Sequence, residues 1–152
     1  MLAHVASAQA EVAAYNALRD EVAGPRIMDY KSIPSCVYTS PEVAFVGLTE
    51  VQAMEKVDVE VGRFPFSASG KARLLGEIGG MVKIIADKKY GEVLGVHIIG
   101  SRATDMIAEA VLGMNMEITI DELAHTIHPH PTLSEGVMEA ALSLSGGAIH
   151  IP

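Results

Sequence analysis

The sequence predicts an α+β fold in which helices flank an antiparallel β-sheet, with one additional helix in front of it. Between an initial helical segment and Gly100, most segments are short apolar runs typical of β-strands, and Val59–Phe66 alternates apolar and polar residues as a half-buried strand does. After Gly100 the apolar residues recur at helical spacing instead. Short turns of the kind found in hairpins join the strands, and strands that precede helices in this way favour an antiparallel sheet.

The first segment of the chain predicts a helix. Residues 2–22 are rich in Ala, Leu and Glu and contain neither Pro nor Gly, and Gly24-Pro25 marks the expected end. The small side chains of Ala3, Ala6, Ala10, Ala13, Ala14 and Ala17 allow a neighbouring element to approach this helix closely. Residues 25–34, with Pro at both ends, are expected to form a linker.

The strand-forming part begins after this linker. The elements expected there are strands at Val37–Thr39, Val43–Val46 and Val59–Phe66, a short helix from Thr49 to about Lys56, and a hairpin of Met81–Ala86 with Val93–Ile99. Thr49 and Gln52 have the spacing of a capping box, which supports the short helix. The turn at residues 87–91 makes the hairpin the clearest of these elements.

Helical patterns occupy the rest of the chain. Thr119 and Glu122 have the spacing of a second capping box, which predicts a short helix through Ala124. A last helix is expected after Pro131. The apolar stripes that these helices present are Ile107, Ala110, Val111 and Met114 in the first, and Leu133, Val137, Ala140, Ala141 and Leu144 in the last.

Composition limits the classes of function. The 152 residues suffice for one domain with a sizeable core, and 49% of them are apolar, which indicates faces that another domain or subunit covers. A formal charge of −8 disfavours nucleic acid as a partner. Neither a secretory signal nor an apolar run of membrane-spanning length is present. A single cysteine excludes an internal disulfide and fits a reducing compartment, so the cytoplasm is the expected location.

The segment that carries most information is His130-Pro131-Thr132-Leu133-Ser134-Glu135. An imidazole five residues before a carboxylate is half of many acid–base devices, because the carboxylate fixes the tautomer and raises the basicity of the ring. The same residues also fit a structural role, since Thr132 and Glu135 have the spacing of a capping box. Both interpretations remain open on the pattern alone.

The partners of such a device are missing from this chain. No G-x-G-x-x-G turn follows a strand, and a single cysteine cannot form a redox-active dithiol. Cys36 lies in an apolar strand and is expected to be an inert core thiol. His125, His128 and His130 raise the alternative of a zinc or nickel site, although the two prolines and the absence of further ligands weigh against it, so no metal is expected.

Several segments together resemble the dihydrolipoamide dehydrogenases, a family of flavin-dependent pyridine nucleotide–disulfide oxidoreductases. The segments that carry this resemblance are residues 1–4, 33–47, Phe64-Pro65-Phe66 with Ala68, Gly70 and Ala72, residues 80–84, and 128–135. They run through the whole chain in the order of that family. The resemblance implies that residues 1–31 are the end of a flavin domain and that 32–152 form the C-terminal interface domain, the FAD/NAD-linked reductase dimerisation fold.

The resemblance also implies a mechanism. The residue matching His130 takes a proton from a dihydrolipoyl thiol, and the residue matching Glu135 orients that imidazole. The pair acts at the flavin and disulfide of the other subunit, so a homodimer is the expected catalytic unit. His128 and Pro129 are expected along the same wall with at most a backbone role, and Pro129 departs from the small residue frequent in the family.

Cofactors and partners follow from the same resemblance. The complete enzyme uses FAD and NAD, and Met1, Leu2 and Ala3 match a helix start that faces the flavin in the full-length protein. This chain by itself is expected to bind neither cofactor tightly and to be inactive. The partner would be a lipoyl-bearing acyltransferase or carrier protein of a 2-oxo acid dehydrogenase-type complex. The alternatives are a glutathione-reductase-like interface domain and a standalone, non-enzymatic dimerisation module.

Overall fold

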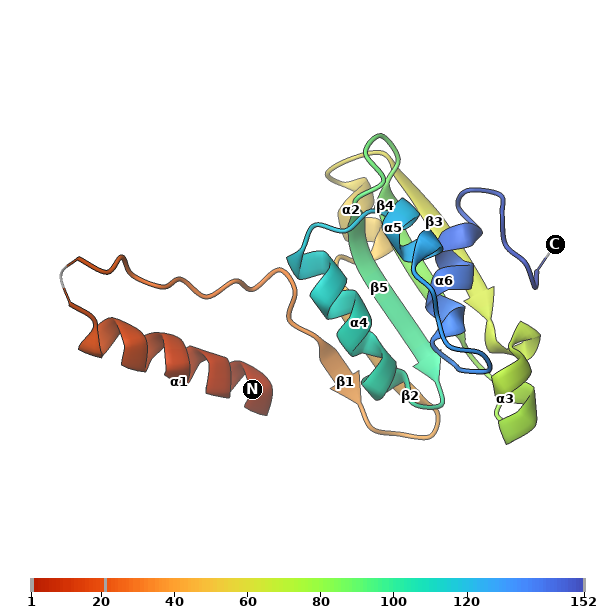
Figure 1. Cartoon of the computed structure of the whole chain (residues 1–152), viewed down its shortest axis with the longest axis horizontal. Helices are drawn as coiled ribbons and strands as arrows, with labels where there is room; N and C mark the ends of the chain where they lie inside the picture. The colour runs from red at the N-terminus through yellow and green to blue at the C-terminus, as the bar shows by residue number, and fades with distance from the viewer. Residues whose placement is uncertain (1, 21, 152) are drawn as a thin grey trace.

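The computed structural model describes residues 2–20 and 22–151, and Figure 1 shows their arrangement. The elements in chain order are α1 (Ala3–Leu18), β1 (Ser35–Val37), β2 (Glu42–Gly47), α2 (Glu50–Met54), β3 (Val59–Pro65), the 3₁₀ turn η1 (Phe66–Ala68), α3 (Gly70–Leu75), β4 (Met81–Asp87), β5 (Val93–Gly100), α4 (Ala103–Asn115), α5 (Ile120–His125) and α6 (Glu135–Leu142).

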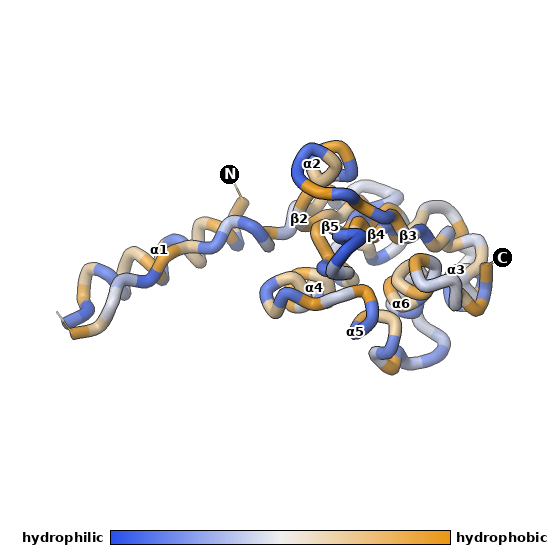
Figure 2. Tube along the Cα trace, turned by 90° about the horizontal axis from the view of Figure 1, so that it is seen from above, coloured by the Kyte–Doolittle hydropathy of each residue, from blue (hydrophilic) through white to orange (hydrophobic). Residues whose placement is uncertain are grey.

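Five strands form one antiparallel sheet in the order β1-β2-β5-β4-β3. Helices α4 and α6 pack against one face, α4 over β2 and β5, and α6 over β3 and β4. Figure 2 shows α2 on the opposite side of the sheet from α4, α5 and α6. The predicted α+β class, with an antiparallel sheet flanked by helices, is therefore confirmed.

The main core lies between the sheet and the pair α4 and α6. Its largest fully buried side chains include Phe64, Phe66, Ile84 and Ile98. Burial of such side chains drives folding, at roughly 25 cal/mol for each Å² of apolar surface removed from water. The two helical stripes expected from the sequence face this core: the residues that are buried are Ile107, Ala110, Leu133, Val137, Ala140 and Ala141, and those partly buried are Val111, Met114 and Leu144.

A glycine lets α6 approach the sheet closely. A Cβ atom at Gly62 of β3 would lie 2.1 Å from the carbonyl oxygen of Ala140 in α6, so only glycine fits there without displacing the helix. Arg63, the next residue, donates its backbone N–H to the Ser143 hydroxyl at 3.2 Å, just beyond the end of α6. These contacts set α6, and with it Glu135, against the sheet.

A carboxylate from the sheet fixes the start of α4. Glu42 Oε2 accepts hydrogen bonds from the backbone N–H and the hydroxyl of Thr104, at 2.9 and 2.7 Å. These two bonds lower the pKa of the Glu42 carboxyl, and negative charge is favourable at a helix N-terminus. Glu42 of β2 thus takes the place of an N-cap residue for α4 and anchors this helix to β2.

The first helix differs from its prediction. It ends at Leu18 instead of about residue 22, because Asp20 accepts the backbone N–H groups of Val22 and Ala23, at 3.2 and 2.8 Å, and so competes with the helix. No residue of α1 is buried, and in Figure 1 the helix lies apart from the sheet. Within the part of the chain that the structure describes, no helix has the length and apolar character needed to span a bilayer.

Other boundaries also need correction. β1 covers Ser35–Val37, two residues earlier than predicted, because Thr39 belongs to the following turn, where its hydroxyl donates to the Pro41 carbonyl at 2.7 Å. The helix α3 was missed, although Ser69 accepts the Ala72 N–H as its N-cap and Gly76 ends it in the left-handed conformation. The capping box of Thr49 and Gln52 before α2, the paired hydrogen bonds between Thr119 and Glu122 at the start of α5, and the β4–β5 hairpin are confirmed.

Candidate active site

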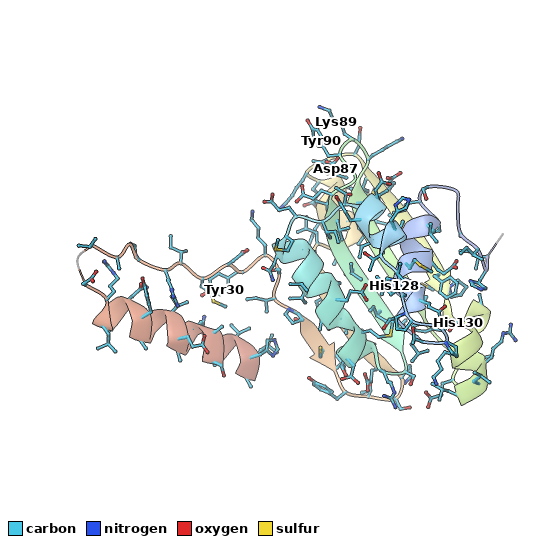
Figure 3. The ribbon with its side chains drawn as sticks, in the orientation of Figure 1. Tyr30, Asp87, Lys89, Tyr90, His128 and His130 are labelled. Atoms are coloured by element: carbon cyan, nitrogen blue, oxygen red, sulfur yellow. The ribbon has the colours of Figure 1, made fainter. Side chains whose placement is uncertain are left out.

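The loop between α5 and α6, residues 126–134, carries His128 and His130. Figure 3 labels His128 and His130 on this loop, near α6. The loop contains no helix or strand, and the His130–Pro131 peptide bond is cis. Side-chain contacts join the loop to α4, α5 and α6.

His130 and Glu135 form the expected pair. The distance from His130 Nδ1 to Glu135 Oε1 is 2.8 Å, which is within hydrogen-bond range. The His130 side chain is 72% exposed, whereas that of Glu135 is only 17% exposed. The carboxylate thus lies under the ring and leaves most of the imidazole open to solvent.

Glu135 also serves the backbone, so the two interpretations of this residue are compatible. Its second oxygen, Oε2, accepts the Thr132 backbone N–H at 2.7 Å, which is one half of a capping box. The other half is absent, because the Thr132 hydroxyl donates to the Pro129 carbonyl at 2.7 Å. As a result α6 begins at Glu135 and not directly after Pro131, which corrects the predicted helix start.

Two neighbouring groups favour the charged form of Glu135. Partial burial on its own raises the pKa of this carboxyl, but the Thr132 N–H and His130 outweigh it, so the pKa of Glu135 is lowered. Glu135 is therefore an anion at neutral pH. An anion beside Nδ1 favours a proton on that nitrogen and so selects one tautomer of the neutral ring.

The geometry also decides which ring nitrogen of His130 can react. A carboxylate only accepts hydrogen bonds, so Nδ1 is the donor and the neutral ring carries its lone pair on Nε2. With the side chain 72% exposed, Nε2 is available to a proton donor from outside this chain. This geometry leaves Nε2 free to accept a proton while the carboxylate orients the ring.

His128 makes a side-chain contact that was not expected from the sequence. Its side chain is 4% exposed, and its Nε2 lies 2.7 Å from Glu109 Oε1 of α4. Its Nδ1 lies 2.8 Å from the Thr126 carbonyl oxygen. The hydrogen bond with Glu109 raises the pKa of His128. The prediction of at most a backbone role omitted this buried side-chain contact.

A third pair, between Glu139 and His150, was not anticipated from the sequence. Glu139 is fully buried in α6, and its Oε1 lies 2.7 Å from His150 Nδ1. Its Oε2 accepts the backbone N–H groups of Ile149 and His150, at 3.0 and 3.3 Å. One signal in the sequence could have indicated this pair. Glu139 is a carboxylate within the apolar pattern of the last helix, four residues and so one helical turn after Glu135. Both pairs line one cavity of about 150 Å³.

The three neighbouring histidines do not converge on a common point. His125 Nδ1 contacts the Asp121 carbonyl at 2.7 Å, while His128 and His130 contact Glu109 and Glu135. Among residues 2–20 and 22–151, no three His, Cys, Asp or Glu side chains are grouped so that they could hold a metal ion.

The remaining candidate residues lie away from this loop. Burial raises the pKa of the Cys36 thiol, which disfavours the reactive thiolate. Leu2 and Ala3 stand at the start of α1, where no side chain caps the helix. Met1 lies outside the described residues. The structure does not bring Leu2 or Ala3 together with His130.

Comparison with known proteins agrees with the fold. Residues 33–141 match the family described as pyridine nucleotide-disulphide oxidoreductase, dimerisation domain. The chain belongs to this family. Dihydrolipoyl dehydrogenase of Bacillus subtilis is 49% identical over 152 residues, which is 98% of this chain and 31% of that protein. The enzyme of the same name from Thermus scotoductus is also 49% identical, over 99% of this chain and 32% of its own length.

Solved structures share the architecture of this dimerisation domain. LpdA from Mycobacterium tuberculosis superimposes with a TM-score of 0.85 at 30% identity, over 94% of this chain and 31% of LpdA. The HOCl-induced flavoprotein disulfide reductase RclA from Escherichia coli gives a TM-score of 0.85 at 26% identity, over 93% and 32%. The chain therefore spans about a third of the length of the relatives that it matches.

Proposed function

We propose that this dimerisation domain is the C-terminal part of an NAD- and FAD-dependent dihydrolipoyl dehydrogenase, which oxidises protein-bound dihydrolipoyl groups. One observation carries the proposal: His130 Nδ1 is bonded to Glu135 at 2.8 Å, while the rest of the ring is exposed. The names of relatives at 44–49% identity over nearly the whole chain give independent support.

The chemical role follows from the protonation states of the pair. A dihydrolipoyl thiol gives its proton to His130 Nε2, and the sulfur becomes a thiolate, which is the species that performs thiol–disulfide exchange. Glu135 stabilises the imidazolium that forms. The disulfide under attack must come from outside this segment, because Cys36 is its single cysteine and is partly buried in β1.

The flavin and the nicotinamide would supply the electron-transfer chemistry from the parts of the enzyme that precede this segment. The contribution of the chain to flavin binding would be the start of α1. The absence of a side-chain cap at Leu2 and of acidic residues in the first turn fits that role, because the N–H groups there stay free for a partially negative group. On this proposal residues 1–31 belong to the flavin domain and 32–152 to the interface domain.

The assembly state and partners are part of the same proposal. A homodimer would bring His130 of one subunit to the disulfide of the other, which accounts for a base that is 72% exposed in the single chain. A lipoyl-bearing acyltransferase or carrier protein would deliver the substrate. The single cysteine fits a reducing compartment, and we propose the cytoplasm.

Two alternative functions would use the pair of His130 and Glu135 differently. A glutathione-reductase-like domain would use the same pair on another disulfide substrate, and a standalone dimerisation module would use Glu135 only as a helix cap. The curated relatives named above favour the dehydrogenase over both.

The proposal is tested by His130→Gln in the complete enzyme that contains this segment. Loss of a catalytic base typically lowers the rate about 10²–10⁴-fold, so dihydrolipoamide oxidation should fall in that range while flavin content stays unchanged. The matched control is His125→Gln, because that ring is also exposed and contacts only a backbone carbonyl within α5. Wild-type turnover in His130→Gln would refute the proposal.

A further inference from the structure

The His128 ring makes hydrogen bonds through both nitrogens, and both partners are oxygen atoms that only accept. Nε2 faces the Glu109 carboxylate at 2.7 Å, and Nδ1 faces the Thr126 carbonyl at 2.8 Å. A neutral imidazole has one N–H, so it can donate only one of these bonds. The contacts therefore require a proton on each nitrogen, and the ring carries a positive charge.

This charge is buried and paired. The His128 side chain is 4% exposed, and an unpaired charge in such a position would be strongly unfavourable. The charged groups that act on it are Glu109 from α4, in direct contact, and Glu135 from α6, at longer range. Both are acidic and both favour the charged ring.

The pair connects the loop to a rigid part of the fold. Glu109 lies on α4, which packs against β2 and β5 and is anchored at its first turn by Glu42. His128 stands two residues before His130 in a loop without regular secondary structure. On the other side of His130, Glu135 belongs to α6. The loop is thus fastened on one side to α4 and on the other to α6.

We propose that Glu109 and His128 form a positioning pair that fixes the loop against α4 and so sets the direction in which His130 presents Nε2. This inference rests on the proposed function for its kinetic consequences only. Because its side chain is only 4% exposed, His128 acts through the position of the loop. It determines where the base lies, and a misplacement of about 1 Å at a reacting group can cost about 100-fold in rate.

The first measurement uses the wild-type chain and needs no variant. Nitrogen chemical shifts of the imidazoles should show His128 with both nitrogens protonated at pH 7, and the neutral form of His130 with its proton on Nδ1. A neutral, single-tautomer His128 at pH 7 would overturn the inference. Because this readout does not involve catalysis, it remains decisive even if His130→Gln refutes the proposed function.

The second measurement uses Glu109→Gln in the complete enzyme. The amide keeps the size of the side chain but removes the charge that holds the second proton on His128. We expect kcat for dihydrolipoamide to fall about 10-fold near pH 6.5, with little change in KM for NAD. The ratio of wild-type to variant kcat should approach one at alkaline pH, where the wild-type ring loses its second proton as well.

The matched control is Glu55→Gln, because it makes the same charge change at an exposed position beside α2, on the other side of the sheet. It should leave kcat unchanged. A purely structural role for Glu109 would give either wild-type kcat in the folded variant or a loss of equal size at every pH, and each of these results contradicts the proposal. If Glu109→Gln fails to fold, His128→Gln in the complete enzyme gives the same test, with the same alkaline convergence expected.

Discussion

His128 and His130 are two residues apart in one loop, and each contacts one glutamate, yet the structure gives them opposite environments. His128 is 4% exposed and uses both nitrogens. His130 is 72% exposed and uses only Nδ1. An imidazole with both nitrogens occupied holds its protons and fastens a loop, whereas one with a free nitrogen can exchange a proton with another molecule.

The difference shows that a His–Glu contact by itself does not define a catalytic pair. The part of the chain that the structure describes contains three such contacts, and the distances from ring nitrogen to carboxylate oxygen are nearly equal, at 2.7, 2.8 and 2.7 Å. Exposure of the ring and the use of the second nitrogen separate His128 from His130. The pair of His150 and Glu139 differs from both in its carboxylate, which is fully buried and also accepts two backbone N–H groups. The following predictions test this distinction, beginning with the largest expected effect.

Glu135→Gln should have the largest effect among the carboxylate changes. Gln has one acceptor oxygen where Glu135 uses two, so it cannot serve both His130 and the Thr132 N–H, and it carries no charge to stabilise imidazolium. Turnover of dihydrolipoamide by the complete enzyme should fall about 10²–10⁴-fold with flavin retained.

Glu122→Gln is the control for this prediction. It replaces the equivalent carboxylate of the α5 capping box, where Gln is also a common residue, and it should leave turnover nearly unchanged. If Glu135→Gln destabilises the protein but keeps full turnover, Glu135 is only a helix cap.

Glu139→Gln tests the third pair through stability. Glu139 is fully buried and accepts hydrogen bonds from two backbone N–H groups as well as from His150. Removal of one acceptor leaves a buried group unsatisfied, so the free energy of unfolding should fall by about 1–3 kcal/mol. Urea denaturation of this chain measures the change, with the exposed Glu55→Gln as the reference. Equal midpoints for the two variants would contradict the structural role of Glu139.

The pH dependence of stability tests the charge of the buried His128 ring. The pKa of His128 is raised in the folded state, chiefly by Glu109. Its contribution to stability is therefore complete below the unfolded pKa of about 6.5 and disappears as the pH rises through the higher folded value. Wild-type protein should exceed His128→Gln by on the order of 1 kcal/mol near pH 6, and the gap should close at alkaline pH. Thermal unfolding of both proteins from pH 6 to alkaline pH measures this difference in stability. A difference that widened with rising pH would show that His128 is not the charged group.

Replacement of Cys36 should have the smallest effect on turnover, and it serves as the baseline for the other variants. Burial raises the pKa of its thiol, so little of it is the reactive thiolate at neutral pH. Cys36→Ser should change dihydrolipoamide turnover by less than about twofold, since loss of a true acid–base group costs far more. We also expect an alkylating reagent to modify the wild-type thiol slowly. Rapid modification with loss of turnover would instead indicate a functional role for Cys36.

The sequence was sufficient to predict the sheet, the hairpin and most helices, because these depend on apolar periodicity and on capping residues a few positions apart. It was less reliable at boundaries. The end of α1 depends on the competing hydrogen bonds of Asp20, and the start of α6 depends on the direction of the Thr132 hydroxyl. The helix α3 carried both a Ser N-cap and a terminal glycine, so local signals for it existed.

By itself, the sequence determined the pairing of His130 with Glu135, because five residues and a helix start bring the two side chains together locally. Only the tertiary structure decided that His128 meets Glu109, 19 residues away, and that His150 meets Glu139, 11 residues away. Those contacts require α4 and the end of the chain to be packed around the loop, and packing against a sheet is a property of the whole fold. The same packing buries one imidazole and leaves the other open to solvent.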